Sequence, residues 1–383
     1  MLSFPIYLDY NSTTPVDGEV LNEMLPLFNK NFGNPASKTH KYGWEAEEYV
    51  EIAREKIADL IHATPHEIIF TSGATEAINL GIKGVAEYAH EKGNHIITCK
   101  TEHKAVLDTC HSLEKNGFEI TFLETDSNGH IDLNILLKSI RKETLLVCLM
   151  YANNETGVIH PIEEVSEITR SKNVLLFVDG TQGVGKIPVD VEKSRIDLMA
   201  FSSHKIYGPK GCGALYLRRK NPRVTLVPQM DGGGHERGFR SGTLNTAGIV
   251  GFGKAAEICS SRMEHDYKLI ETLRNKLENA LTSDKNIHVN GDTKNRLPNV
   301  SNLSFGKMDG AFLITSLKNI AIASGSACTS ANPEPSHVLL AMGLTKQKTG
   351  SSVRFSLGRF TTEEEIDYTI EYVLEVVKKL NKI

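Results

Sequence analysis

From about residue 41 to residue 255, short apolar runs alternate with longer segments in which apolar residues recur every three or four positions. The segment 42–61 shows this helical spacing. Each short run is typical of a buried strand, and the runs occupy residues 67–70, 95–98, 119–123, 145–150, 174–179 and 198–202. Because strands alternate with helices, we predict an α/β fold whose mostly parallel sheet is flanked by helices.

After about residue 260 the pattern changes. The charged segment 261–282 predicts a long helix, and the strand-like run 299–305 follows it. Near the end of the chain, Thr361 or Thr362 precedes a glutamate-rich helical segment and can cap it. This part of the chain therefore indicates a smaller α+β domain.

The length of 383 residues exceeds what a single core comfortably holds. We expect a large domain over residues 16–259. A smaller domain would combine residues 1–15 with residues 260–383 and would carry a loop at about 322–335.

The composition, 40% hydrophobic and 23% charged with a formal net charge of -4, is that of a globular protein and gives no reason to expect nucleic acid as a ligand. No apolar run approaches the length of a membrane span. The first residues lack the basic and apolar parts of a signal peptide. We therefore expect a cytoplasmic protein that binds neither membrane nor nucleic acid directly.

The six cysteines are scattered along the chain, and no two have C-x-x-C spacing. This spacing favours neither a zinc site nor a disulfide framework. Cys328 stands apart because its neighbours are Gly, Ser, Ala, Thr and Pro, which cannot bury a thiol. A thiol exposed on a loop is either an incidental surface cysteine or a reactive group.

Ligands of open α/β sheets bind at the carboxyl ends of strands, so the residues after each run matter. A helix begins near Ala74 and Thr75, where free amides could bind phosphate or form an ordinary capped start. Asp179 ends another run and could cap a helix or hold a proton on a ring nitrogen. Lys205 follows the last run and is either a solvated charge or a Schiff-base amine. Pyridoxal phosphate requires an anion site, an acid and an amine, so together these features predict that cofactor.

Sequence motifs recur along nearly the whole chain. They are "YLDYNSTTPV", "FGNPASKTH", "FTSGATEAINL", "KTEHKAVLDTC", "NNETGV", "VDGTQ", "SHKIYGPKG", "GGGHERGFRSGT", "SGSACTSA" and "VRFSLGRFTTEEEIDYT". In these motifs the chain resembles the group I cysteine desulfurases, and especially the bacterial type that serves iron–sulfur cluster assembly. Those enzymes are fold-type I pyridoxal-phosphate enzymes of the class-V aminotransferase family. The resemblance implies the same fold, with a large domain and a smaller α+β domain.

By motif position the resemblance also implies roles for single residues. Lys205 would bond the cofactor aldehyde, Asp179 would keep the pyridine nitrogen protonated, and His103 would stack on the ring as an acid–base group. Arg354 would bind the substrate carboxylate through its planar guanidinium, and Asn154 would also contact the substrate. The further cofactor-binding residues would be Ala74, Thr75, Asn154, Gln182, Ser202, His204 and Thr243.

A cysteine desulfurase converts L-cysteine to L-alanine and keeps the sulfur as a persulfide on one of its own cysteines. The resemblance assigns this third catalytic role, beside Lys205 and His103, to Cys328. It also implies a homodimer, because Thr243 resembles a phosphate contact that the other subunit donates. The sulfur would pass to an acceptor protein, either an iron–sulfur scaffold or a carrier for transfer-RNA thiolation. No resident metal is required.

The chain departs from the family pattern in small ways. Gly180 and Ser12 stand where relatives usually carry alanine, and both changes should spare the chemistry. Bacterial relatives often have a C-terminal tail that engages the scaffold, whereas this sequence ends at Ile383, so docking by that tail is not expected.

Two alternatives to a desulfurase remain open. One is another fold-type I activity, an aminotransferase or a selenocysteine lyase; an aminotransferase needs no loop thiol, so Cys328 argues against it. The other is a non-catalytic scaffold that uses Cys328 as ligand of a metal or a transient cluster. That scaffold would have no need of Lys205, Asp179 and His103.

Overall fold

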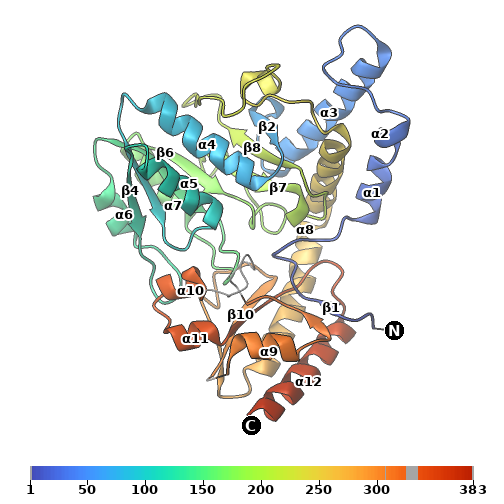
Figure 1. The fold of residues 1–383 in the computed structure, drawn as a ribbon, viewed down its shortest axis with the longest axis vertical. Helices are drawn as coiled ribbons and strands as arrows, with labels where there is room; N and C mark the ends of the chain where they lie inside the picture. Colours follow the sequence, from blue (N-terminus) through green and yellow to red (C-terminus); the bar gives the residue numbers. More distant parts are fainter. Residues whose placement is uncertain (1, 307, 325–334, 382–383) are drawn as a thin grey trace.

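The computed structural model describes residues 2–306, 308–324 and 335–381. Its central feature is a seven-stranded sheet with the order β2-β8-β7-β6-β5-β3-β4 (Figure 1). All neighbouring strands are parallel except the two pairs that include β8. The strands are β2 (Ile68–Thr71), β3 (His95–Cys99), β4 (Glu119–Leu123), β5 (Thr144–Met150), β6 (Leu175–Asp179), β7 (Leu198–Ser202) and β8 (Gly213–Leu217). The predicted α/β class is confirmed.

All six strands predicted between residues 67 and 202 exist, each within one residue of its predicted ends. The prediction missed β8, because its short apolar run directly follows a glycine-rich turn. This strand lies antiparallel between β2 and β7, so the sheet is mostly but not wholly parallel.

Helices cover both faces of the sheet, as its alternating side chains require. Along β6, Leu176 and Val178 join one apolar cluster while Phe177 joins the other. The face that contains Phe177 packs against α4 (Ala74–Ala89) and α5 (Lys104–Glu114). The opposite face packs against α3 (Lys41–Leu60), α6 (Leu133–Ser139), α7 (Ile162–Ser171) and the first part of α8 (Thr246–Leu281).

The long helix α8 begins earlier than the predicted segment 261–282, because the side chain of Asn245 caps its first turn by accepting from Gly248 N. Its first half packs on the large sheet through Cys259, and its second half packs in a separate cluster through Leu277. The predicted domain boundary at 259/260 therefore lies inside one continuous helix.

The separate cluster combines the two ends of the chain. Ile6 and Leu8 pack there with Phe355. Its strands are β9 (Ile287–Val289), β10 (Val300–Phe305) and β12 (Ser352–Ser356), which form an antiparallel sheet, and β1 (Ile6–Tyr7) and β11 (Ile320–Ala321), which pair in parallel. This composition is what the predicted smaller domain would require.

The remaining helices are short except for the last. They are α1 (Gly18–Met24), α2 (Pro26–Asn29), α9 (Gly310–Ser316), α10 (His337–Ala341), α11 (Lys346–Gly350), α12 (Glu363–Leu380) and the 3-10 turns η1 (Pro65–Glu67), η2 (Ser203–Lys205) and η3 (Glu236–Gly238). Thr362, one of the two predicted caps, begins α12 in a capping box with Glu365. None of the helices in the described ranges has the length and apolar character that a membrane crossing requires.

Candidate active site

The carboxyl ends of the parallel strands share one edge of the seven-stranded sheet, and most predicted site residues lie along it. Ala74 follows β2, Asp179 ends β6, and Lys205 follows β7. Asn154 comes after β5 and His103 after β3. Residues far apart in sequence therefore meet because six strands point in the same direction.

Lys205 lies in the turn η2 and is only partly buried. Its Nζ donates hydrogen bonds to the backbone carbonyls of Asn11 and Ser12, each at 2.6 Å. Burial, followed by the nearby Arg354 guanidinium, lowers the pKa of Lys205 to about 8, although Asp9 acts in the opposite direction. A large share of this amine is therefore neutral in mildly alkaline solution, as a nucleophile or a base must be.

Asp179 is buried, with 5% of its surface exposed, at the last position of β6. Its Oδ1 accepts a hydrogen bond from Thr181 N at 3.0 Å, which holds the carboxylate in place. The Asp179 charge also acts on Lys205 and His103, whose pKa values it raises. The acid, the amine and the imidazole therefore occupy one electrostatic environment.

His103 is the N-cap of α5, and its Nδ1 accepts from Ala105 N at 3.1 Å. The side chain is exposed at the sheet edge, yet the surrounding protein atoms lower its pKa by desolvation, and Lys205 and His337 lower it further. In the neutral ring that results, Nδ1 is the acceptor and Nε2 carries the proton. His103 can thus present a single N–H to a ligand.

The start of α4 has the features of an anion site. Gly73, its N-cap, has no side chain to satisfy the first amides of the helix, which begins at Ala74. Thr75 is exposed in the first turn, and Ser202 lies close by, with its Oγ 3.9 Å from where a side chain on Gly73 would begin. The predicted residues Ala74, Thr75 and Ser202 are thus brought together.

His204 and Thr243 lie around this group in different ways. His204 Nδ1 pairs with Thr13 Oγ1 at 3.1 Å, and burial, with Lys205 as the next cause, lowers its pKa to about 4. Thr243 lies on the exposed segment between η3 and α8, and its side chain makes no hydrogen bond within the described part of the chain.

Arg354 enters the site from β12, in the C-terminal part of the chain. Its guanidinium donates to Asn154 O at 2.9 Å, to Asp9 Oδ1 at 2.7 Å and to Ser12 Oγ at 2.8 Å. It is 95% shielded, with 5% of its surface exposed, and its Nε has no partner among the described residues. A buried donor without a partner is costly unless a ligand completes it, which suits a substrate carboxylate.

Sequence reasoning missed the hub of this site, Asn11, and the contact made by Ser12. Asn11 is 1% exposed, and its backbone carbonyl accepts from both Lys205 and Gln182 Nε2, the latter at 3.0 Å. Ser12 was noted only as a departure from the family pattern, whereas its hydroxyl accepts from Arg354. The one available signal was that the polar run at residues 9–14 follows directly on the apolar strand β1.

Cys328 lies outside the described residues. The other five cysteines are buried, and burial raises the pKa of Cys99, Cys110 and Cys212 to about 12 and that of Cys259 to about 11. Thiols with such pKa values are almost wholly protonated at neutral pH and are poor nucleophiles. Within the described ranges, no group of three or more His, Cys, Asp or Glu side chains could hold a metal ion.

Comparison with known proteins agrees with this geometry. A sequence model of the family described as Aminotransferase class-V matches residues 6–369. The cysteine desulfurase IscS of Anaeromyxobacter sp. (strain Fw109-5) is 53% identical over 383 residues, which cover 100% of this chain and 95% of that protein. The solved structure of a NifS-like protein has a TM-score of 0.91 at 39% identity and covers 99% of this chain and 100% of its own. SspA in complex with cysteine has a TM-score of 0.82 at 36% identity, with 93% and 100% covered.

The sheet, its ligand edge and these similarities define a fold-type I enzyme that depends on pyridoxal 5′-phosphate. The chain belongs to the class-V aminotransferase family and, within it, to the cysteine desulfurases.

The residues at the sheet edge fit this cofactor. The amine of Lys205 has a lowered pKa, Asp179 is buried and ionisable, and the first amides of α4 lack side-chain partners. These three features correspond to an aldehyde-binding amine, a partner for a ring nitrogen and a phosphate site.

Proposed function

We infer that this protein removes the sulfur of L-cysteine, releases L-alanine and keeps the sulfur as a persulfide on Cys328. The observation that carries the proposal is the meeting of Lys205, Asp179 and His103 at one sheet edge, opposite Arg354. The test is to add L-cysteine and a reductant to the purified protein loaded with pyridoxal phosphate. Alanine and sulfide should form in equal amounts, and the absorbance of the cofactor should change when L-cysteine binds.

When bound, pyridoxal phosphate supplies an aldehyde that bonds the substrate amine and a ring that takes up the electron pair left at Cα. Asp179 keeps the pyridine nitrogen protonated, and Ala74, Thr75, Ser202 and His204 hold the phosphate. The Nε2 proton of His103 and the amide of Gln182 face the ring.

The residues of the chain then carry the protons and the sulfur. Arg354 binds the substrate carboxylate with Asn154 beside it, and Lys205 accepts the Cα proton. The Cys328 thiolate attacks the substrate sulfur, so that an S–S bond forms as the C–S bond breaks. The substrate carbon takes up a proton and leaves as alanine, and the balance is L-cysteine plus thiol giving L-alanine plus persulfide.

Arg354→Lys tests the carboxylate site. Lysine keeps the charge but loses the planar pair of N–H donors, and a lost charge-assisted hydrogen bond costs about 1.5–3 kcal/mol. We therefore expect KM for L-cysteine to rise roughly tenfold to a hundredfold, with a smaller change in kcat. The matched control is Arg218→Lys, because Arg218 is also buried and ion-paired but lies on the opposite edge of the sheet. A normal KM in Arg354→Lys would remove Arg354 from the substrate site.

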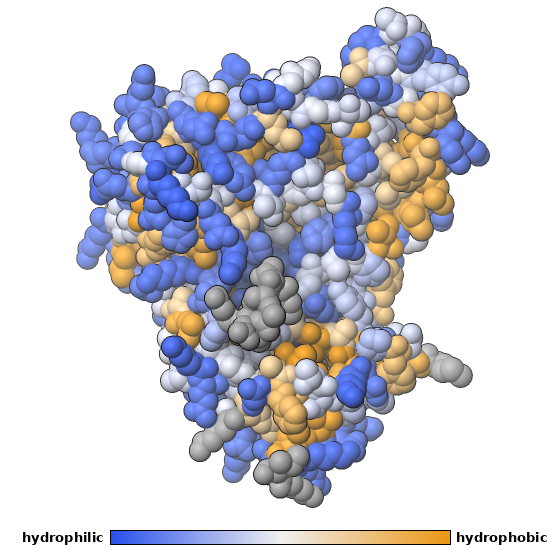
Figure 2. Space-filling view, viewed as in Figure 1, coloured by the Kyte–Doolittle hydropathy of each residue, from blue (hydrophilic) through white to orange (hydrophobic). Residues whose placement is uncertain are grey.

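We further propose that the protein works as a homodimer in the cytoplasm. Large apolar side chains gather over α1 and α2, where Figure 2 shows an apolar region at the upper right. Phe28 and Phe32 are each 64% exposed there, and Leu25 is 52% exposed. A patch of this kind on a single chain marks an interface, and two-fold pairing of identical chains is the commonest way to cover one.

A mixing experiment tests whether Thr243 reaches the site of the partner subunit. Lys205→Ala homodimers should be inactive, and Thr243→Ala homodimers should bind the cofactor weakly. A heterodimer of the two has one site with both changes and one with neither, so mixing and refolding the subunits should restore activity. Activity that stays at the average of the two parents, or a fully active monomer in sedimentation, would contradict the shared site.

The persulfide sulfur would pass to an acceptor protein. An iron–sulfur scaffold is the first proposal, since the IscS relatives share the full length of this chain, and a carrier for transfer-RNA thiolation is the second. Capture of each purified acceptor by the persulfide-loaded enzyme, followed by mass measurement of the transferred sulfur, separates the two.

A further inference from the structure

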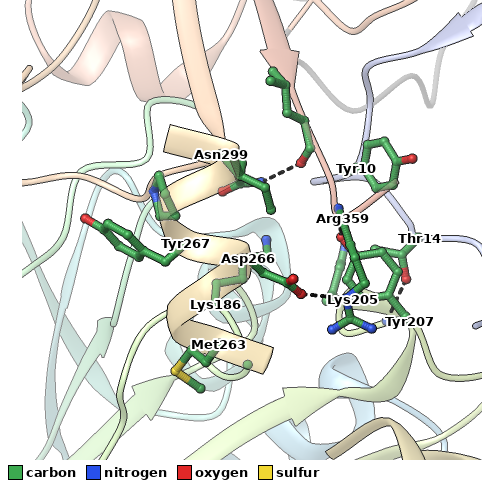
Figure 3. Close-up of a pocket in the computed structure, with 14 residues that line it drawn as sticks. Tyr10, Thr14, Lys186, Lys205, Tyr207, Met263, Asp266, Tyr267, Asn299 and Arg359 are labelled. Carbon is green, nitrogen blue, oxygen red and sulfur yellow. Dashed lines mark hydrogen bonds and ion pairs between the residues drawn. The ribbon is translucent and has the colours of Figure 1, made fainter. Parts of the chain in front are cut away.

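Lys186 lies beside the site and has no role in the reaction described above. Figure 3 shows it with Lys205 in the lining of one pocket, next to α8. Burial, and then the positive charges of Lys205 and Arg354, hold its pKa well below the ordinary value for lysine. An amine kept there against desolvation and two neighbouring cations needs compensating contacts.

Two side-chain amide oxygens supply these contacts. Lys186 Nζ donates to Asn11 Oδ1 at 3.1 Å and also to Gln182 Oε1. Because the amine donates its protons to both oxygens, it decides which end of each amide faces it. A second donor, Asn299 Nδ2, reaches Asn11 Oδ1 at 2.8 Å and reinforces the same orientation.

The opposite ends of the two amides then have defined directions. Gln182 Nε2 donates to the backbone carbonyl of Asn11 at 3.0 Å, and Asn11 Nδ2 donates to Asn154 O at 3.0 Å. The same Asn11 carbonyl accepts from Lys205 Nζ at 2.6 Å. The orientation set at Lys186 is therefore transmitted to the group that holds the reactive amine.

We propose that Lys186 is a positioning residue: it orients the Gln182 amide so that the N–H groups, and not the oxygen, face the cofactor side of the site and the carbonyl that holds Lys205. This inference rests on the proposed function, in which Gln182 addresses the oxygen side of the cofactor ring. An N–H donor there stabilises the deprotonated ring oxygen, whereas a reversed amide would repel it.

The test is a double-mutant cycle read from the absorbance of the bound cofactor as a function of pH. Lys186→Met keeps the length of the side chain and removes its donors, and Gln182→Leu keeps the volume and removes the amide. Each single change should move the midpoint of the cofactor titration upward by about one pH unit. The double variant should show the shift of Gln182→Leu alone, because Lys186 acts through Gln182.

Additive shifts in the double variant would overturn the proposal, because they would mean that Lys186 acts by charge or by general stability. An unchanged midpoint in Lys186→Met would overturn it as well. The control Lys210→Met removes an exposed lysine charge that also acts on His204, but no contact to Gln182, and should leave the midpoint in place. If Lys186→Met fails to bind the cofactor, Lys186→Gln, which retains a donor, takes its place in the cycle and should stay near the wild-type midpoint.

The outcome is separate from that of the proposed function. Alanine formation by the wild-type enzyme tests the reaction, whereas the titration midpoints need only the bound cofactor. Wild-type enzyme that makes alanine while the shifts add would leave the reaction in place and remove the role of Lys186.

Discussion

Lys205→Ala is expected to abolish alanine formation, with a loss of at least about a thousandfold, because the variant lacks both the cofactor-binding amine and the base for the Cα proton. Its absorbance should also lack the band of covalently bound cofactor. In the wild-type protein stripped of cofactor, uptake of pyridoxal phosphate should accelerate as pH rises through about 8, since the pKa of Lys205 lies there and only the neutral amine attacks an aldehyde.

The matched control is Lys210→Ala, which removes a lysine from the exposed end of the same turn region. It should keep the cofactor band and turn over at a rate close to that of the wild type. Alanine formation by Lys205→Ala at a wild-type rate, or a cofactor uptake rate that does not change with pH, would show that another amine binds the aldehyde.

Cys328→Ser is expected to separate cofactor chemistry from sulfur transfer. The variant keeps Lys205, Asp179 and Arg354, so its cofactor band should remain and should still shift when L-cysteine binds. A hydroxyl is a far poorer nucleophile than a thiolate at neutral pH, so alanine and sulfide should fall by at least about a hundredfold. Mass measurement of peptides after incubation with L-cysteine should find the extra sulfur on Cys328 in the wild-type enzyme.

The buried cysteines provide the controls for this experiment. Cys110→Ser and Cys212→Ser should change turnover by no more than about an order of magnitude, because thiols whose pKa burial raises to about 12 act only through stability. Persulfide on either of them, or full activity in Cys328→Ser, would refute the assignment of Cys328 as the sulfur acceptor.

The strands that bear the site were predictable because their signal is local. A strand such as β7 is a continuous apolar run, and its boundaries follow from residues that are neighbours in the chain. The same holds for the start of α4 at Ala74 and the cap of α12 at Thr362. Asp179 and Lys205 could be placed at one edge because parallel strands bring all their carboxyl ends together.

Helix α8 and strand β8 show where local signals fail. The first turns of α8 are rich in glycine, which lowers helix propensity, yet Ile249 and Phe252 are buried there against the large sheet. Strand β8 is short and follows a glycine-rich turn, and it is stabilised by hydrogen bonds to β2 and β7 on both sides. In both cases tertiary packing overrides a weak local preference.

The sequence by itself determined the strand exits, the helix start that can bind phosphate and, through the resemblance, the amine, the acid and the sulfur-accepting thiol. Only the tertiary structure decided that Asn11 carries the hydrogen bonds of Lys205 and Gln182, that Lys186 orients both amides, and that Ser12 contacts Arg354. These contacts join segments separated by most of the chain. A hydrogen bond between them depends on where the sheet edge, the N-terminal segment and β12 come to lie, and no short stretch of sequence contains that information.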